Sequence, residues 1–239
     1  MSRKTVLVTG ASRGLGLCLV RSALEEGALV LAGARDPQAA GLKELGQKYP
    51  ESLIILKMDV ADTRSVEEAA AEAARYTDRL DLVINNAGIH SDTSFLELEK
   101  TNVDDCLSVY NVNTVGPLRV VKAFLGLMEK AGEESGCLAV NISSESGSIG
   151  TAGRKKEFDY CMSKAALNME TRLLDNYLEE RGIRVIAVHP GWMRTDMGGA
   201  NADLDPYETA CQLTALFEKT AREKDSPIFM DNEGRVYPW

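Results

Sequence analysis

Tyr160 and Lys164 could form a proton-donating pair. They are four positions apart, so on a helix they share a face. A tyrosine hydroxyl has an ordinary pKa of about 10, and a nearby ammonium stabilises the phenolate and lowers that pKa. We therefore expect Tyr160 to act as an acid at neutral pH and to protonate a developing alkoxide. Taken alone, such a pair is more often a packed ring beside a solvated amine.

Ser143 and Ser144 follow the apolar run 138–142, which has the pattern of a buried strand. In open α/β sheets, ligands bind at the carboxyl ends of the strands. A serine hydroxyl at that edge could hold a carbonyl oxygen by a hydrogen bond, as the stabilisation of an oxyanion requires.

A glycine-rich turn, with the spacing Gly10-x-x-x-Gly14-x-Gly16, separates the first apolar run from a helical stripe. Glycines let the backbone turn sharply and approach a ligand closely. The following helix N-terminus offers free N–H groups and a positive dipole end to a pyrophosphate. A plain strand–helix turn is the alternative, but it needs only one glycine.

The elements that must position these residues alternate along the chain. Short apolar runs without alternation, typical of strands buried on both faces, lie at 6–8, 29–32, 53–56, 80–84, 138–142 and 185–188. Segments of helical length, such as 62–76 and 103–130, lie between them. This pattern predicts an α/β fold with a doubly wound parallel sheet, in a single domain over residues 1–239.

The last part of the chain has its own helix signal. Asp205 and Pro206 are typical of an N-cap and a first helical position, and the helix is expected to run to about Lys224. Residues 227–230 resemble a final edge strand.

Composition excludes several function classes. The chain has 239 residues and a net charge of −9, which disfavours nucleic acid as a partner. No apolar run approaches the roughly 20 residues of a membrane span, and the first one is too short for a secretory signal. Five cysteines without C-x-x-C spacing and two distant histidines indicate free thiols, a cytoplasmic protein and no metal site.

The glycine spacing resembles the cofactor turn of the short-chain dehydrogenase/reductase superfamily, and the resemblance continues along nearly the whole chain. The motifs that carry it occur in the family's order: Asp59-Val60, Asn85-Asn86-Ala87-Gly88, Asn113, Ser143-Ser144, Tyr160-Cys161-Met162-Ser163-Lys164 and Pro190-Gly191. Joint occurrence in order makes this a specific match, because any one motif alone would be weak.

The resemblance implies a Rossmann fold and a catalytic set of Asn113, Ser144, Tyr160 and Lys164, with Ser143 turned towards the sheet. Ser144 and Tyr160 would hold the substrate oxygen, and Asn113 would hold a water near Lys164; Asn111 is a competing position for this asparagine. Asp59 and Val60 would contact the adenine, and Thr195 the nicotinamide carboxamide. The expected cofactor-binding residues are Gly10, Ser12, Arg13, Gly14, Leu15, Gly16, Arg35, Asp59, Val60, Asn86, Ala87, Gly88, Tyr160, Lys164, Pro190, Gly191, Trp192 and Thr195.

Cofactor choice is expected at the end of the second strand. By resemblance, Ala34 stands where NAD enzymes carry an aspartate, and Arg35 follows it. Arg13 in the glycine turn adds a second cation for a 2′-phosphate. Asp36 could pair with Arg35 and weaken this attraction. We expect NADP(H) as the cofactor, with NAD(H) the less favoured alternative.

One segment departs from the family. Tyr160 comes 16 positions after Ser144, a few more than is usual, and the extra residues lie in Thr151–Asp159. This insertion indicates a modified pocket rim, although its basic triplet, Arg154-Lys155-Lys156, is more often a solvated loop than a substrate anchor. Trp192 and Met193 are candidates for the pocket wall, although large apolar residues are more often part of the core.

Residues 189–199 and 229–239 resemble the sniffer-like carbonyl reductases and the C-factor-like branch. The first implies NADPH-dependent reduction of a small-molecule ketone, aldehyde or quinone to an alcohol. The second implies a cofactor-binding signalling protein with secondary or no catalysis. The family also suggests a homodimer through the helices at 103–130 and 160–180. The stripe of Ala165, Leu167, Met169 and Leu173 on the second helix could partly face the partner, and packing on the sheet is an alternative of at least equal weight.

Overall fold

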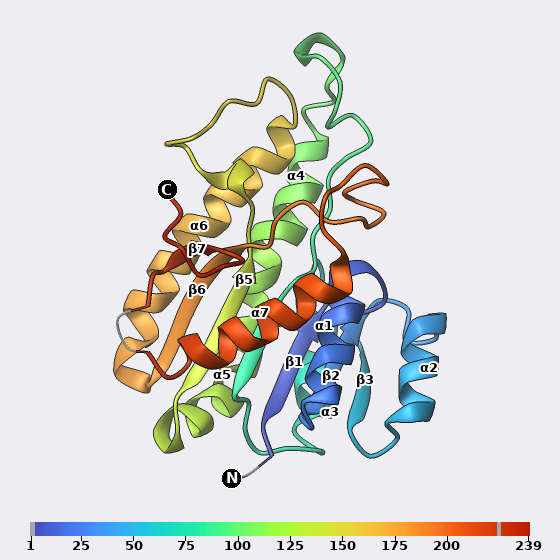
Figure 1. The fold of residues 1–239 in the computed structure, drawn as a ribbon, viewed down its shortest axis with the longest axis vertical. Coiled ribbons are helices and arrows are strands. Elements are labelled where there is room, and N and C mark those ends of the chain that lie inside the picture. Colours follow the sequence, from blue (N-terminus) through green and yellow to red (C-terminus); the bar gives the residue numbers. More distant parts are fainter. Residues whose placement is uncertain (1–2, 224–225) are drawn as a thin grey trace.

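Seven parallel strands form one sheet through the middle of the molecule, in the order β3-β2-β1-β4-β5-β6-β7 (Figure 1). The computed structural model describes residues 3–223 and 226–239. The strands are β1 (Thr5–Thr9), β2 (Leu29–Ala34), β3 (Leu53–Lys57), β4 (Leu82–Asn85), β5 (Cys137–Ile142), β6 (Ile183–His189) and β7 (Phe229–Asp231). The predicted doubly wound parallel sheet is confirmed.

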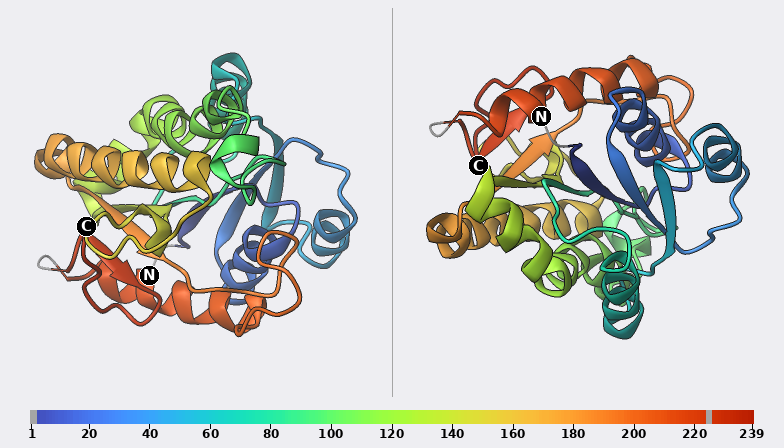
Figure 2. Two further views of the ribbon diagram at one scale, coloured as in Figure 1. Left: turned by 90° about the horizontal axis from the view of Figure 1, so that it is seen from above. Right: turned by 90° about the horizontal axis from the view of Figure 1, so that it is seen from below.

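Helices cover both faces of this sheet. They are α1 (Gly14–Glu25), α2 (Ala40–Lys48), α3 (Thr63–Ala73), α4 (Asp105–Tyr110), α5 (Gly116–Glu134), α6 (Phe158–Leu178) and α7 (Pro206–Thr220). Seen along the strands, α1 and α7 lie together on one face, and α3, α5 and α6 lie on the other (Figure 2). Short helical turns η1 (Leu98–Lys100), η3 (Glu145–Gly147) and η4 (Glu179–Arg181) complete the helical structure.

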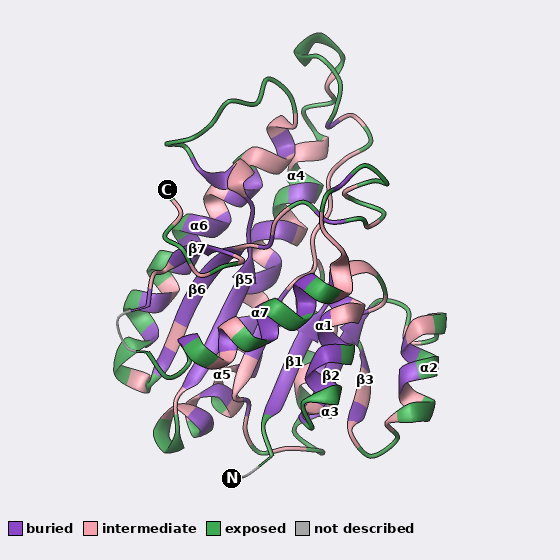
Figure 3. Cartoon of the chain, viewed as in Figure 1, coloured by how far each residue is buried: buried purple, intermediate pink, exposed green. Residues whose placement is uncertain are grey.

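The two-sided burial of the strands explains why their apolar runs do not alternate. All five residues of β1 are buried. Val6 and Val8 pack in the cluster under α1 and α7, whereas Leu7 packs in the cluster under α3 and α5, because successive side chains point to opposite faces. The strands are accordingly buried along their length, and the exposed residues gather in the loops and on the outer helix faces (Figure 3).

The helix predicted at 103–130 is interrupted. A π-helical turn, η2 (Asn111–Val115), separates α4 from α5, and Pro117 follows at the start of α5. Proline has no N–H, so it cannot give the regular helical hydrogen bond to the carbonyl four residues earlier, which belongs to Asn113. The interruption therefore releases the main-chain oxygen of Asn113 from the regular helical ladder.

The N-cap predicted for the last helix is confirmed, since the Asp205 carboxylate accepts hydrogen bonds from the N–H groups of Tyr207 at 2.9 Å and Glu208 at 3.1 Å. This helix, α7, ends at Thr220, and the expected end at Lys224 lies outside the described residues. Across residues 3–223 and 226–239, no helix combines the length and the apolar character needed to cross a membrane.

Candidate active site

A cavity of about 670 Å³ opens at the carboxyl ends of the strands. Every residue expected from the sequence to bind the cofactor lines it, from Gly10 in the turn after β1 to Thr195 beyond β6. Of the expected catalytic residues, Ser144, Tyr160 and Lys164 line the cavity, and Asn113 does not.

The glycine turn is packed against the loop after β4, and this packing explains its residue types. A Cβ on Gly16 would lie 2.3 Å from the carbonyl oxygen of Gly10, and a Cβ on Gly10 would lie 2.8 Å from Cα of Ala87. Asn86 fastens the two segments, because its side-chain amide donates to the carbonyl of Thr9 at 2.9 Å. The turn is thereby held in one conformation at the start of α1.

The start of α1 suits a pyrophosphate. Its first turn has no acidic residue, and the Arg13 side chain, at the N-cap, makes no capping hydrogen bond. The first N–H groups of α1 thus have no side-chain acceptor at the N-cap, beside a glycine-lined surface that any larger residue would fill. These features fit the pyrophosphate of a dinucleotide at the start of α1.

At the far end of the cavity, Arg35 is exposed beside the buried Ala34. Asp36 accepts a hydrogen bond from the N–H of Gln38 at 2.8 Å, and none of the ion pairs among the described residues joins it to Arg35. Arg13 does have an acidic partner: its guanidinium lies 3.0 Å from the Asp196 carboxylate. Both cations expected to meet a 2′-phosphate therefore line the cavity, one of them in an exposed ion pair.

The two serines after β5 have different roles. The Ser143 hydroxyl donates to the side-chain oxygen of Asn168 on α6 at 2.6 Å, so it is tied to the protein interior. Ser144 is at the N-cap of η3, where its Oγ accepts from the N–H of Ser146 at 3.1 Å. Ser144 also forms a hydrogen bond with the side chain of Tyr160.

Tyr160 and Lys164 share a face of α6, with Nζ of Lys164 5.5 Å from the centre of the tyrosine ring. Burial nevertheless raises the pKa of Tyr160 to about 12, outweighing the lowering by its hydrogen bond with Ser144. The sequence-based expectation that the pKa of Tyr160 is lowered is therefore wrong. The ammonium of Lys164 is directed to the main-chain oxygen of Ile142 at 2.7 Å, and burial lowers its own pKa to about 8.

Asn113, rather than Asn111, lies close to the ammonium of Lys164. Its side-chain oxygen accepts from the N–H of Ile89 at 2.8 Å, and its amide donates to the Ile89 carbonyl at 2.8 Å and to Ser163 Oγ at 3.0 Å. Asn111 instead binds Arg119 and the carbonyl of Ala61. Both amide hydrogens of Asn113 are used, so a water would be held by its main-chain carbonyl or by the remaining lone pair of Oδ1.

Asp159 fastens the loop after β4 to the start of α6. This buried carboxylate in the first turn of α6 accepts from the Ser94 hydroxyl at 2.6 Å and from the N–H of Ser91 at 2.9 Å. Burial opposes its ionisation, but these hydrogen bonds outweigh that effect and lower the pKa of Asp159. The sequence analysis missed this residue, although its place beside Tyr160 was a usable signal.

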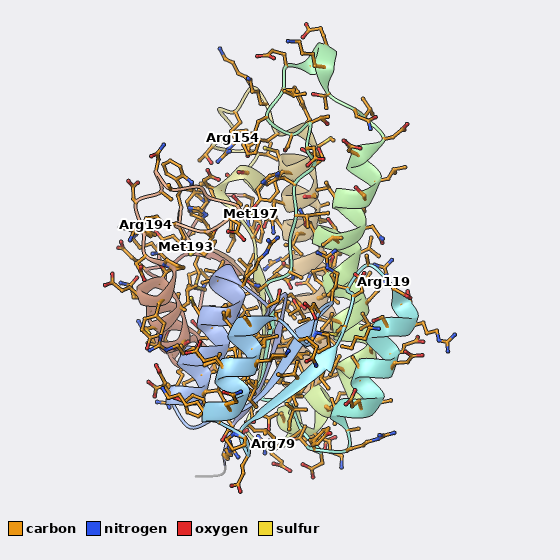
Figure 4. All side chains as sticks on the ribbon, turned by 90° about the vertical axis from the view of Figure 1, so that its right-hand side faces the viewer. Arg79, Arg119, Arg154, Met193, Arg194 and Met197 are labelled. Atoms are coloured by element: carbon orange, nitrogen blue, oxygen red, sulfur yellow. The ribbon has the colours of Figure 1, made fainter. Side chains whose placement is uncertain are left out.

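The rim of the cavity contains residues that the sequence analysis missed, beside others that it named. His90 and Phe95 pack edge to face at 5.0 Å between ring centres, and both line the cavity. Trp192 also lines it and is 53% exposed, while Met193 belongs partly to the core. Arg154, from the inserted segment, and Met197 also line the cavity, and both lie in the upper half of the molecule as drawn in Figure 4. Glu145 and Glu157 line the cavity beside Arg154.

Comparison with known proteins identifies similar chains. The short chain dehydrogenase family model matches residues 4–204. An uncharacterised oxidoreductase of Schizosaccharomyces pombe is 36% identical over 225 residues, covering 94% of this chain and 87% of that protein. An NADPH-bound carbonyl reductase from chicken fatty liver is 34% identical with a TM-score of 0.88, and the carbonyl reductase Sniffer of D. melanogaster is 28% identical with a TM-score of 0.93. Both structures match over 100% of each chain.

Proposed function

This chain belongs to the short chain dehydrogenase family of oxidoreductases, and we propose that it is an NADPH-dependent reductase of small carbonyl compounds such as ketones, aldehydes or quinones. The observation that carries the proposal is the meeting of Ser144, Tyr160 and Lys164 at one end of a cavity whose other end is the glycine turn and Arg35. The similarity to two carbonyl reductases supports the substrate class.

Each polar group at the catalytic end has a task in this reaction. Tyr160 holds the substrate's carbonyl oxygen by a hydrogen bond, together with Ser144, whose single hydroxyl proton would turn from Glu145 to the substrate. Both hydrogen bonds stabilise the charge that develops on that oxygen. When bound, the reduced nicotinamide would supply the hydride. With its pKa raised to about 12, Tyr160 is fully protonated at neutral pH and is ready to donate its proton to the alkoxide, which is the stronger base.

Lys164 and Asn113 restore the proton. The ammonium of Lys164, held at the Ile142 carbonyl, faces the tyrosine from one helical turn away. The Asn113 carbonyl, released from the helical ladder by Pro117, offers an acceptor for a water near Lys164. A chain from Tyr160 through Lys164 and this water would lead the replacement proton in from solvent.

Selectivity for NADPH follows from charge at the adenine end. Arg35 and Arg13 place two guanidinium groups on the cavity wall, and Ala34 leaves that position without a carboxylate. A 2′-phosphate would gain charge-assisted hydrogen bonds there, whereas the 2′-hydroxyl of NADH would find no acidic partner at Ala34. The chicken carbonyl reductase, whose structure contains NADPH, supports this choice.

We also propose that two copies of the chain form a homodimer through α4, α5 and α6. Met169, Leu173 and Tyr177 are each at least 60% exposed along one side of α6, and Leu107 on α4 is 75% exposed. The apolar stripe expected from the sequence is divided, because Leu167 is buried against the sheet side while Met169 and Leu173 face outward. An exposed apolar face of this kind is typical of an interaction surface.

The test is turnover by the purified protein. Loss of NADPH absorbance is followed with an aromatic aldehyde, a vicinal diketone and a quinone, each alone. We expect measurable reduction of at least one of them, and formation of the alcohol confirmed by chromatography. Absence of turnover with every carbonyl compound, together with absence of alcohol oxidation with NADP⁺, would contradict the proposal.

A further inference from the structure

A carboxylate lies one hydrogen bond away from the proposed catalytic hydroxyl. Glu145 directly follows Ser144, and its Oε2 accepts from Ser144 Oγ at 3.0 Å and from Ser146 Oγ at 2.9 Å. Hydrogen bonds from Arg154 and from these serines overcome the effect of burial and lower the pKa of Glu145, so the carboxylate is ionised at neutral pH. A substrate that reaches Ser144 therefore meets this negative charge.

Arg154 joins Glu145 to a second carboxylate. One terminal nitrogen of its guanidinium binds Glu145, and the other binds Glu157. All three side chains line the cavity, and the Glu157 side chain is only 13% exposed. Two carboxylates share one guanidinium, so this Glu145–Arg154–Glu157 bridge has a net charge of −1.

The backbone at Glu157, the last member of this bridge, has an unusual conformation. Among the described residues, Glu157 is the one non-glycine residue with a positive φ, at 62°. This left-handed conformation is uncommon for a residue with a side chain and needs support from its surroundings. Glu157 N–H donates to the carbonyl of Ser94 at 2.7 Å, which fixes the end of the inserted segment against the loop after β4.

Other charges nearby do not cancel the bridge. Lys156 lies 3.0 Å from Glu97 outside the cavity, and neither lines it. Arg13 and Asp196 form a neutral pair. The ammonium of Lys164 lies beyond Tyr160 and is directed to the Ile142 carbonyl. A substituent that extends from the carbonyl group towards Glu145 would thus meet the negatively charged bridge.

We propose that the Glu145–Arg154–Glu157 bridge selects substrates by their charge. It admits neutral and cationic carbonyl compounds and excludes those that carry a carboxylate or sulfonate. This inference rests on the proposed carbonyl reduction, and it assigns the specificity to the inserted segment. An anionic substituent would be repelled by the uncompensated carboxylate in a partly water-excluded site, where charges interact more strongly than in water.

The test uses three benzaldehydes of similar size with para-isopropyl, para-carboxylate or para-trimethylammonium groups. With NADPH, we expect kcat/KM of the carboxylate compound to be about tenfold or more below that of the neutral one, and the cationic compound to equal or exceed the neutral one. Equal use of the carboxylate and the neutral compound would overturn the proposal.

Variants separate the bridge from general effects. Glu157→Gln removes one charge without touching Ser144 and should reduce the preference for the cationic over the anionic compound by about threefold to tenfold. Arg154→Gln should increase that preference. The matched control is Glu99→Gln, which removes an equal charge at an exposed position that does not line the cavity and should leave the preference unchanged. An identical preference in Glu157→Gln and the unaltered chain would contradict the proposal.

A binding measurement distinguishes this inference from the proposed function. Calorimetric titration of the three corresponding benzyl alcohols into the protein with saturating NADP⁺ reports charge selection without turnover. Discrimination against the carboxylate in binding, with no aldehyde reduced, would leave the bridge assignment standing and refute the reductase. Turnover of all three aldehydes with equal affinities for the three alcohols would refute the bridge alone.

Discussion

Nζ of Lys164 lies 5.5 Å from the centre of the Tyr160 ring, yet its hydrogen bond goes to the main-chain oxygen of Ile142 at 2.7 Å. The lysine is thus held near the tyrosine by the end of β5 rather than by the phenol itself. Because the surrounding protein desolvates both groups, the pKa of Tyr160 is raised and that of Lys164 is lowered. This arrangement keeps the tyrosine protonated, which favours reduction of a carbonyl group.

Tyr160→Phe removes the proposed acid and keeps the ring. We expect kcat for carbonyl reduction to fall by about a hundredfold or more, in line with the loss of general acid catalysis. The dissociation constant for NADPH, measured by fluorescence titration, should stay near its original value, because the lost hydroxyl serves the substrate. Near-full activity in this variant would instead favour a cofactor-binding signalling protein without this chemistry.

Reduction should lose rate in alkaline solution. The pKa of Lys164 is about 8, so its ammonium is present below that pH and is lost above it. At saturating NADPH and with a non-ionising aldehyde, kcat/KM should be level near neutral pH and fall as the pH rises through about 8. A profile that stays flat through this region would show that the ammonium has no role in the rate.

Arg35→Ala tests the cofactor preference. Loss of the guanidinium should raise KM for NADPH by about tenfold, since a charge-assisted contact to the 2′-phosphate is removed, and should hardly change KM for NADH. Arg64→Ala is the matched control, because it removes an exposed arginine on α3 that does not line the cavity. Equal use of both cofactors by the unaltered protein would be inconsistent with the assignment.

Glu170 on α6 should make stability depend on pH. It is 8% exposed, its Oε1 has no hydrogen-bond partner among the described residues, and burial raises its pKa to about 8. A raised pKa in the folded state means that stability is highest below the ordinary carboxyl pKa and is lost as the pH rises towards 8.

Glu170→Gln removes that dependence. We expect its free energy of unfolding at pH 8 to exceed that of the unaltered protein by about 4 kcal/mol, with a much smaller difference at acidic pH. Urea unfolding at the two pH values measures this, and Glu67→Gln on the exposed side of α3 is the control. An equal effect at both pH values would mean that the carboxyl does not titrate as described.

Assembly can be tested by mass. Sedimentation at micromolar concentration should give about twice the chain mass of 26.0 kDa. Leu173→Glu places a charge on the exposed apolar face of α6 and should yield monomers, whereas Val236→Glu, at an equally exposed position near the chain end, should not. A monomer for the unaltered protein would refute the dimer.

The sequence by itself determined the sheet, the glycine turn and the order of the motifs. Runs such as 138–142 predict buried strands because a strand covered on both faces needs apolar residues at every position. Gly10 and Gly16 could be assigned to a tight turn from the sequence, because a side chain at either position would lie less than about 3 Å from neighbouring backbone atoms. The residue type alone therefore indicates the close contact. Local rules of this kind require no knowledge of distant parts of the chain.

Only the tertiary structure decided the charges and partners at the site. The spacing of Tyr160 and Lys164 predicted a shared face, but the direction of the tyrosine pKa depends on burial by segments far away in sequence. In the sequence, Arg154 belongs to a basic triplet typical of a solvated loop. In the folded chain it lies beside Glu145 at the start of η3 and Glu157 just before α6, and it forms ion pairs with both. Desolvation and ion pairing depend on three-dimensional distances between residues, and neither spacing nor composition contains those distances.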